Sequence, residues 1–322
     1  MKGFLSTVVK VFVSVAIMYF LLRSLDTSEL WETVASVNPL AIVFVAVLFI
    51  CLQSISTYRW SVILKKDLDV PYLRLFSIYF VGMFFNNFLP TMVGGDLVKG
   101  YYLYRYSKNG NVALASIFMD RYAGFGALMV ITSLALIPGY ALIKGTQLPG
   151  FFVILIGGFA AMSMVIWIGP LHSWAMRILE RIHFYGINRK IDTFYKVLMS
   201  YKKRYDILVK IFACSVLVQG GVILGYYVLG TMGLGMQIPL GYYFLFIPLT
   251  TVISMLPISL SGIGIREGAF IYLFAMAGAT KEEAIALSLL WFATSVLVSM
   301  IGGVEYVRMG GRKAVREGMS GQ

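Results

Sequence analysis

The sequence predicts an all-α polytopic membrane protein with about six full spans and two re-entrant helical hairpins, arranged as an inverted repeat. Three observations support this fold class. Hydrophobic residues make up 59% of the 322-residue chain and charged residues 13%, against roughly 25% charged residues in soluble domains. Lys and Arg cluster between apolar runs, as they do beside membrane spans. Finally, two similar motifs follow Leu-Pro at Pro90 and Pro257, 167 residues apart.

Six apolar runs approach or exceed the about twenty residues that a spanning helix needs. They are residues 4–22, 39–57, 112–141, 151–170, 207–230 and 284–307. Two further runs, 75–90 and 240–257, are shorter and end in Leu-Pro with glycines following. The first run lacks a small-x-small cleavage site and is followed by Arg23. We therefore expect a retained span there rather than a signal peptide.

The distribution of Lys and Arg predicts the orientation of these segments. The basic links are 58–74, 171–206 and the tail 308–322. The other links carry one basic residue at most. Basic links face the cytoplasm, and all three do so only if 75–106 and 240–277 each enter the membrane and return to the same side. We therefore expect two re-entrant hairpins on opposite faces and cytoplasmic N- and C-termini.

The domain organisation follows from the repeated motif. The stretches "LPTMVGGDLVKGYYLY" and "LPISLSGIGIREGAFIYL" share Leu-Pro, a glycine pair, a charge and an aromatic return. A shift of 167 residues, the distance from Pro90 to Pro257, also superposes the flanking spans. Apolar stretches rich in Gly and Pro can, however, match by chance. An odd number of spans separates the copies, which predicts the inverted repeat typical of transporters. The expected parts of this single transmembrane domain are 1–38 (first span and outer link), 39–141 (repeat A), 142–206 (linking span and basic amphipathic cytoplasmic segment), 207–307 (repeat B) and 308–322 (basic cytoplasmic tail).

The first hairpin motif contains Asp96 and Lys99, although a charge at membrane depth costs about 2.5–3.5 kcal/mol. Three residues apart on a helix, they lie on one face and can pair. Gly94 and Gly95 would leave backbone N–H groups free for an anion at a helix N-terminus. A lipid phosphate suits that position, with Lys99 or Arg105 as counter-charge, whereas Asp96 is also a good helix N-cap.

Other polar residues in the apolar segments are further candidates for a binding site. They are Asn86, Asn87, Asp120, Arg121, Arg266 and Glu267, together with the hairpin glycines Gly262 and Gly264. The planar fork of Arg266 suits bidentate phosphate contact, with Glu267 as its partner when no ligand is bound; the alternative is a structural ion pair that fastens the hairpin. Asp120 and Arg121 either complete the site or clamp the first hairpin. The two asparagines either contact a headgroup or satisfy backbone groups where the helix breaks.

The sequence disfavours an enzyme. It contains no nucleophile elbow, phosphate-binding loop or metal-ligand spacing, so we expect no catalytic residue, metal or cofactor. The membrane flanks account for the net charge of +12, so we expect no nucleic-acid partner. Within 171–206, helically spaced apolar residues that start at Leu171 and Ile191 alternate with basic ones. Two amphipathic parts on an anionic cytoplasmic leaflet are expected, or else an ordinary basic loop.

The stretches "NNFLPTMVGGDLVKGYYLYR", "MDRYAGFGAL" and "LPISLSGIGIREGAFIYLF" resemble the lysylphosphatidylglycerol synthase transmembrane-region family. This flippase-like module also occurs as stand-alone membrane proteins, and the likeness covers nearly the whole chain. The resemblance points to Pro90, Gly94, Gly95, Asp96, Arg121, Pro257, Gly262, Gly264, Arg266 and Glu267. The family often has Glu followed by Arg where Asp96 and Lys99 stand here. The soluble aminoacyl-transferase domain of full-length synthases is missing, so the resemblance implies lipid translocation rather than aminoacylation.

The sequence thus predicts a flippase-like protein of the bacterial cytoplasmic (inner) membrane that translocates an anionic phospholipid or a polyprenyl-linked lipid. The expected partners are membrane lipids with an anionic or polyprenyl-phosphate headgroup. Two alternatives remain open. One is a secondary transporter of a small anion, and the other is a membrane subunit that presents lipid to a glycosyltransferase or aminoacyl-transferase partner.

Overall fold

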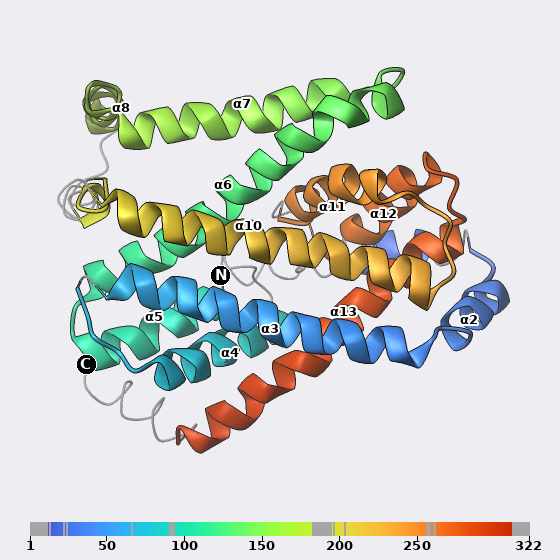
Figure 1. The fold of residues 1–322 in the computed structure, drawn as a ribbon, viewed down its shortest axis with the longest axis horizontal. Helices are drawn as coiled ribbons and strands as arrows, with labels where there is room; N and C mark the ends of the chain where they lie inside the picture. The colour runs from blue at the N-terminus through green and yellow to red at the C-terminus, as the bar shows by residue number, and fades with distance from the viewer. Residues whose placement is uncertain are drawn as a thin grey trace.

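A computed structural model describes the residues that position the predicted site. These are residues 12, 14–21, 23, 25–65, 67–89, 94–181, 195, 197–202, 204–255, 259 and 262–310. This part of the chain forms helices and no strands (Figure 1). The helices are α2 (Thr27–Ala35), α3 (Pro39–Leu64), α4 (Tyr72–Phe88), α5 (Gly94–Ser107), α6 (Gly110–Ile143), α7 (Leu148–Trp167), α8 (Gly169–Arg181), α10 (Tyr205–Val228), the π-helical turn η1 (Leu229–Gly233), α11 (Leu240–Met255), α12 (Ile265–Ala275) and α13 (Lys281–Arg308).

Five helices of the described residues are long and apolar enough to cross a membrane. They are α3, α6, α7, α10 continued by η1, and α13. This confirms five of the six predicted spans, each extending a few residues beyond or short of the apolar run. The remaining predicted span, 4–22, lies mainly outside the described residues, although residues 14–21 are helical. The chain is therefore an all-α polytopic membrane protein.

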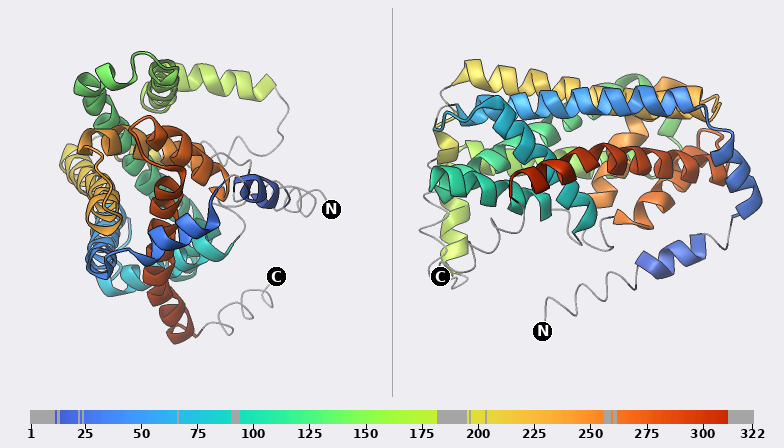
Figure 2. Two further views of the ribbon diagram at one scale, coloured as in Figure 1. Left: turned by 90° about the vertical axis from the view of Figure 1, so that its right-hand side faces the viewer. Right: turned by 90° about the horizontal axis from the view of Figure 1, so that it is seen from below.

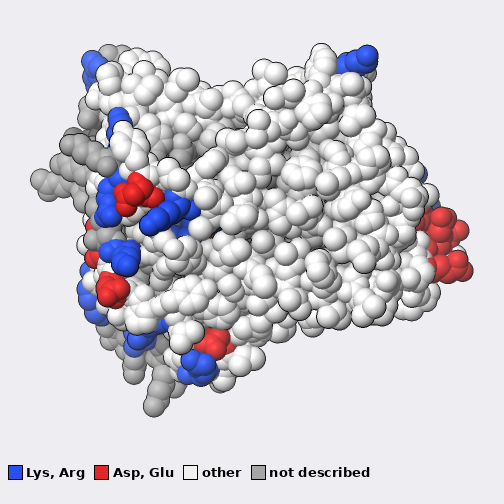
Figure 3. Space-filling model, in the orientation of Figure 1, with Lys and Arg blue, Asp and Glu red and all other residues white. Residues whose placement is uncertain are grey.

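Charged residues gather at the two ends of the molecule and leave the face between them nearly free of charge (Figure 3). Large apolar side chains on this middle part point outward, such as Val43, Phe44 and Val47 of α3. The acidic residues of α2 lie at one end. There the Asp26 carboxylate accepts hydrogen bonds from the hydroxyl and N–H of Ser28 and from the N–H of Glu29, which lower its pKa. An apolar belt between two polar ends is the surface that a bilayer requires.

The two halves of the chain repeat one order of helices. A long helix, a hairpin of two shorter helices and another long helix occur as α3 to α6 and again as α10 to α13. Helices α3 and α10 lie side by side and run in opposite directions (Figures 1 and 2), with Leu48 facing Gly225 and Leu52 facing Gly221. The arrangement is the predicted inverted repeat.

Each hairpin packs against the last long helix of the other repeat. Gly302 of α13 touches the backbone of Phe80 in α4, and Gly139 of α6 touches Leu245 in α11. A Cβ atom at Gly302 would lie 1.9 Å from the Phe80 carbonyl oxygen, so this crossing requires glycine. The exchange of contacts makes the two repeats one interlocked core.

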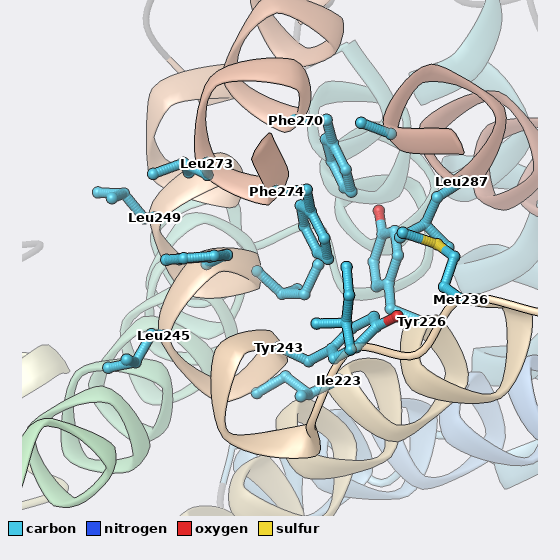
Figure 4. Packing of buried hydrophobic residues seen from close by; sticks show 14 of the residues in the cluster. Ile223, Tyr226, Met236, Tyr243, Leu245, Leu249, Phe270, Leu273, Phe274 and Leu287 are labelled. Atoms are coloured by element: carbon cyan, nitrogen blue, oxygen red, sulfur yellow. The ribbon is translucent and has the colours of Figure 1, made fainter. Parts of the chain in front are cut away.

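The two predicted hairpins are present as antiparallel helix pairs. In α4–α5 the backbones of Gly82 and Gly95 meet directly. In α11–α12 the contact is aromatic, with Phe274 at 5.2 Å from Tyr243 and 5.6 Å from Phe246 between ring centroids. This contact belongs to the largest hydrophobic cluster, to which α10 and α13 also contribute (Figure 4). Pro90 and Pro257, predicted at the hairpin breaks, lie outside the described residues.

Helices α7 and α8 lie at the edge of the bundle. Few residues of α7 are buried, and Tyr122 of α6 holds it by accepting a hydrogen bond from Trp167 Nε1 at 2.8 Å. Helix α8 turns away from α7 across the basic end (Figures 1 and 2), as the amphipathic pattern from Leu171 predicts. Most of the second predicted amphipathic part lies outside the described residues, as does most of the tail.

Candidate functional site

A group of charged side chains lies inside the first repeat. The guanidinium of Arg59 in α3 donates from Nε to Asp120 Oδ1 of α6 at 2.8 Å. Its second amino nitrogen is also 2.8 Å from the same oxygen, and Nη1 donates to Ser215 Oγ of α10 at 2.9 Å. Arg59 is 5% exposed and Asp120 2%. This pair therefore joins three helices from both repeats deep in the core.

The first hairpin adds an acid and a base to this group. The ammonium of Lys99 lies 3.3 Å from Asp96 Oδ1 and 3.7 Å from Asp120 Oδ2. It also lies 4.3 Å from the ring centre of Tyr79 and 5.3 Å from that of Trp60, where the π faces attract a cation. The predicted pairing of Asp96 with Lys99 is therefore present, and Lys99 connects both carboxylates.

Arg121 completes the group from α6. Its Nε donates to Asp96 Oδ2 at 2.7 Å, while its side chain remains 48% exposed. No other hydrogen bond of its guanidinium occurs among the described residues. We call Arg59, Asp96, Lys99, Asp120 and Arg121 the charge cluster. It holds three cations and two carboxylates, so its net charge is +1. One of these cations, Arg121, has terminal N–H donors that form no hydrogen bond among the described residues.

A cavity of about 500 Å³ adjoins the charge cluster. Helices α3 to α7, α10 and α11 contribute to its wall, so both repeats build it. Beside Arg59, Lys99, Asp120 and Arg121, its polar lining is uncharged: Gln53, Ser56, Tyr79, Asn86, Tyr122, Gln219 and Thr251. The space is large enough for a phosphorylated headgroup, and its lining offers amides, hydroxyls and a net positive charge.

A second hollow of about 760 Å³ runs between α5 and α6 and is mostly apolar. Leu97, Leu114 and Ile117 are among its lining residues. It shares Phe118, Arg121 and Met255 with the cavity. We call it the α5–α6 groove. The half-exposed guanidinium of Arg121 therefore stands between a polar compartment and an apolar one.

The predicted residues of the first hairpin divide into two sets. Asn86 borders the cavity, and its Oδ1 accepts a hydrogen bond from the N–H of Gly95 at 2.8 Å. This N–H group is therefore not free for an anion, which corrects one expectation from the sequence. Gly94 and Asn87 border neither hollow, and the Asn87 Nδ2 atom is buried without a partner in the described structure. Arg105 is exposed in the last turn of α5 and borders neither hollow.

The predicted residues of the second hairpin form a separate, closed group. Glu267 is fully buried and accepts hydrogen bonds from the N–H of Gly264 at 2.7 Å and from Arg266 Nε at 2.9 Å. Arg266 Nε also donates to Ser288 Oγ at 3.0 Å, and its guanidinium lies over Phe292. Gly264 has φ +85°, as Gly262 has +80°, so both positions favour glycine. Neither hollow is bordered by any of the four predicted residues, which fits the structural ion-pair interpretation.

Sequence reasoning missed most of the polar residues that line the cavity, and for three of them the sequence holds a signal. Arg59 was assigned to the basic link 58–74, but α3 continues to Leu64 and carries it into the core. The apolar residues that follow Arg59 in "RWSVIL" are the signal that the span continues. Gln53 and Gln219 lie in predicted spans and superpose within one residue under the repeat shift. A polar residue at equivalent places of both copies would have singled them out.

The comparison with known proteins agrees with this architecture. The family model described as "Lysylphosphatidylglycerol synthase TM region" matches residues 7–303. The chain belongs to the lysylphosphatidylglycerol synthase transmembrane-region family. Two curated relatives, each named "UPF0104 membrane protein", come from Methanothermobacter thermautotrophicus. One is 25% identical over 93% of both chains, and the other is 24% identical over 80% of this chain and 82% of its own length. Both relatives thus align with this multi-pass membrane protein over most of their own length.

Proposed function

We propose that the protein moves the headgroup of an anionic lipid from one leaflet of the membrane to the other. The main support is the charge cluster, whose Arg121 borders both the polar cavity and the apolar α5–α6 groove. A lipid combines a charged headgroup with apolar chains, so two joined compartments of opposite character match one molecule. The family name, which refers to a lipid-modifying enzyme, agrees with a lipid ligand.

The depth of the charge cluster suits such a path. Asp120 lies ten residues into α6, or about 15 Å along the helix axis at 1.5 Å per residue. The hydrocarbon core of a bilayer is about 30 Å thick. A headgroup held beside Arg121 would therefore be near the middle of the membrane, while its chains remain in lipid through the groove. We propose the cytoplasmic membrane as its location, with the basic end of the bundle facing the cytoplasm.

The groove also bears on the two alternatives from the sequence. A transporter of a small water-soluble anion needs a polar path that excludes lipid, whereas the lining of the groove favours chains over water. A subunit that only presents lipid to an enzyme needs the same binding site but no movement between leaflets. A translocation assay therefore separates all three functions.

The test uses purified protein in liposomes that contain a trace of fluorescent phosphatidylglycerol. Protein-dependent exchange of the label between leaflets is expected, and Arg121→Gln should slow it at least tenfold because the exposed guanidinium is lost. Arg308→Gln removes an exposed cation at the end of α13 and should leave the rate unchanged. No lipid movement in any liposome composition would contradict the proposal. Uptake of labelled soluble phosphate without lipid movement would favour the small-anion alternative.

The groove provides an independent variant. Leu114→Trp fills it from α6 and should slow lipid exchange at least tenfold without changing the charge cluster. Leu134→Trp places the same side chain on an exposed position of α6 outside both hollows and serves as the matched control. Equal rates for the two variants would show that lipid chains do not use the groove.

A further inference from the structure

We infer that the ligand is a lipid whose single phosphate carries an uncharged, hydroxyl-rich group, and that the cavity rejects headgroups bearing an amine. This inference rests on the proposed function and specifies its substrate class. It follows from how the charges around the cavity are satisfied and from which polar groups have no partner.

Every carboxylate at the two hollows is already held by two cations. Asp120 is the acidic residue among the described residues that line the cavity, and it contacts Arg59 and Lys99. Asp96 borders the groove and contacts Lys99 and Arg121. Asp96 Oδ1 accepts no hydrogen bond in the described structure, but it is buried and lies 3.3 Å from the Lys99 ammonium. An ammonium group on a ligand would therefore find no exposed carboxylate without a cation, and it would add to a net charge of +1. A headgroup with one negative charge instead brings the site to neutrality, which is what a charge in a low-dielectric environment requires.

The exposed part of Arg121 identifies where the phosphate binds. Its Nε is occupied by Asp96, and the two terminal nitrogens form the free side of the planar fork. Two parallel donors of this kind suit two oxygens of one phosphate. Because Arg121 borders both hollows, a phosphate bound here would direct its chains into the groove and its headgroup substituent into the cavity.

The wall of the cavity beyond Arg121 suits hydroxyl groups. The amide of Gln53 and the hydroxyl of Tyr79 form no side-chain hydrogen bonds within the described residues, and both border the cavity. Gln219 donates to the carbonyl of Gly124 at 3.1 Å, which leaves its Oε1 as an acceptor toward the cavity. An amide both donates and accepts, and so does a hydroxyl. A glycerol, inositol or sugar substituent would therefore satisfy several of these groups at once.

The experiment measures binding of lipids with identical acyl chains to the full-length protein in detergent by native mass spectrometry. Phosphatidylglycerol should bind about tenfold more tightly than phosphatidic acid, since one or two net hydrogen bonds of about 1 kcal/mol each correspond to roughly that factor. The affinity for phosphatidylglycerol should also exceed the affinities for phosphatidylethanolamine and lysylphosphatidylglycerol by tenfold or more. Equal binding of these four lipids would overturn the inference. Glycerol 3-phosphate, tested alone, should bind far more weakly, and equal affinity would assign the site to a soluble polyol phosphate.

Two variants test the residues themselves. Gln53→Leu with Gln219→Leu should lower phosphatidylglycerol binding to the phosphatidic acid level, while Gln237→Leu, at an exposed position outside the cavity, should not. Gln53→Glu adds a free carboxylate and should raise the affinity for lysylphosphatidylglycerol relative to phosphatidylglycerol at least tenfold. This gain of binding requires a folded protein, so its absence in a variant of normal thermal stability would contradict the inference. Lipid exchange without headgroup preference would support the proposed function and refute the inference. Selective binding without lipid exchange would support the inference and refute the proposed function.

Discussion

Among single residues, Arg59 and Arg121 have opposite tasks within one charge cluster. Arg59 is buried and its contacts to Asp120 and Ser215 are complete. Arg121 is half exposed and uses one nitrogen. A buried ion pair is weak evidence for stability as such, but the loss of one partner leaves an uncompensated buried charge. The two arginines should therefore respond differently to substitution.

Arg59→Ala should destabilise the protein by about 3–5 kcal/mol, the usual effect of breaking a buried pair. Asp120 would keep only Lys99, at 3.7 Å. The double variant Arg59→Met with Asp120→Leu removes both charges and should cost less than half as much. Arg121→Gln should change stability little because its side chain is half exposed. Denaturant unfolding in detergent measures the three values, and a double variant as unstable as Arg59→Ala would contradict this explanation.

The sequence contains enough information to predict the Asp96–Lys99 pair but not its other partners. A separation of three residues on one helix determines that pairing locally. Arg59 and Asp120 are 61 residues apart, and their contact depends on how α3 and α6 are rotated about their axes. Periodicity gives no such rotation in helices that are apolar on all sides. The assignment of Arg59 to a link was a further error about where α3 ends.

Among helices, the first hairpin depends on glycine at its crossing. A Cβ atom at Gly95 would lie 1.9 Å from the carbonyl oxygen of Gly82 and 2.6 Å from Asn86 Cγ. The helices α4 and α5 can therefore approach closely enough for Asn86 to accept the Gly95 N–H. The sequence predicts an anion-binding role for the glycines, and for the asparagines either headgroup contact or the satisfaction of backbone groups, of which Asn86 performs the second. Their observed role is the contact between the two helices, which positions Asp96 and Lys99.

Gly95→Ala should consequently destabilise the hairpin, by about 1–3 kcal/mol or more, as expected for overpacking. Gly220 in α10 is the matched control, because a Cβ atom there meets nothing within 4 Å. Gly220→Ala should be neutral or stabilise the protein by up to about 1 kcal/mol, since Ala is the better residue in a helix interior. Thermal unfolding in detergent compares the two. An equal shift for both variants would mean that the Gly82–Gly95 crossing adapts to a side chain.

For the whole molecule, the order and type of the helices follow from the sequence because hydrophobic runs and charged links are properties of single segments. The pseudo-symmetry follows in outline from the motifs after Leu-Pro. What the sequence leaves undetermined is which faces meet: the exchange of partners, with α4 on α13 and α11 on α6, depends on Gly302 and Gly139. The resulting asymmetry between an open charge cluster in one repeat and a closed Arg266–Glu267 group in the other is likewise a property of the assembled core.

The charge distribution makes the orientation of the whole molecule testable. In a variant with Cys51→Ala and Cys214→Ala, Ala35→Cys places an exposed thiol at the end of α2, and Ser173→Cys places one on α8 at the opposite, basic end. If basic links face the cytoplasm, a membrane-impermeant maleimide applied to intact cells should label Ala35→Cys at once and Ser173→Cys only after permeabilisation. Labelling in the reverse order would invert the proposed orientation, and labelling of both in intact cells would contradict a single orientation. Because Ala35 and Ser173 lie on helices at opposite ends of the apolar belt, the result also assigns each end of the bundle to one side of the membrane.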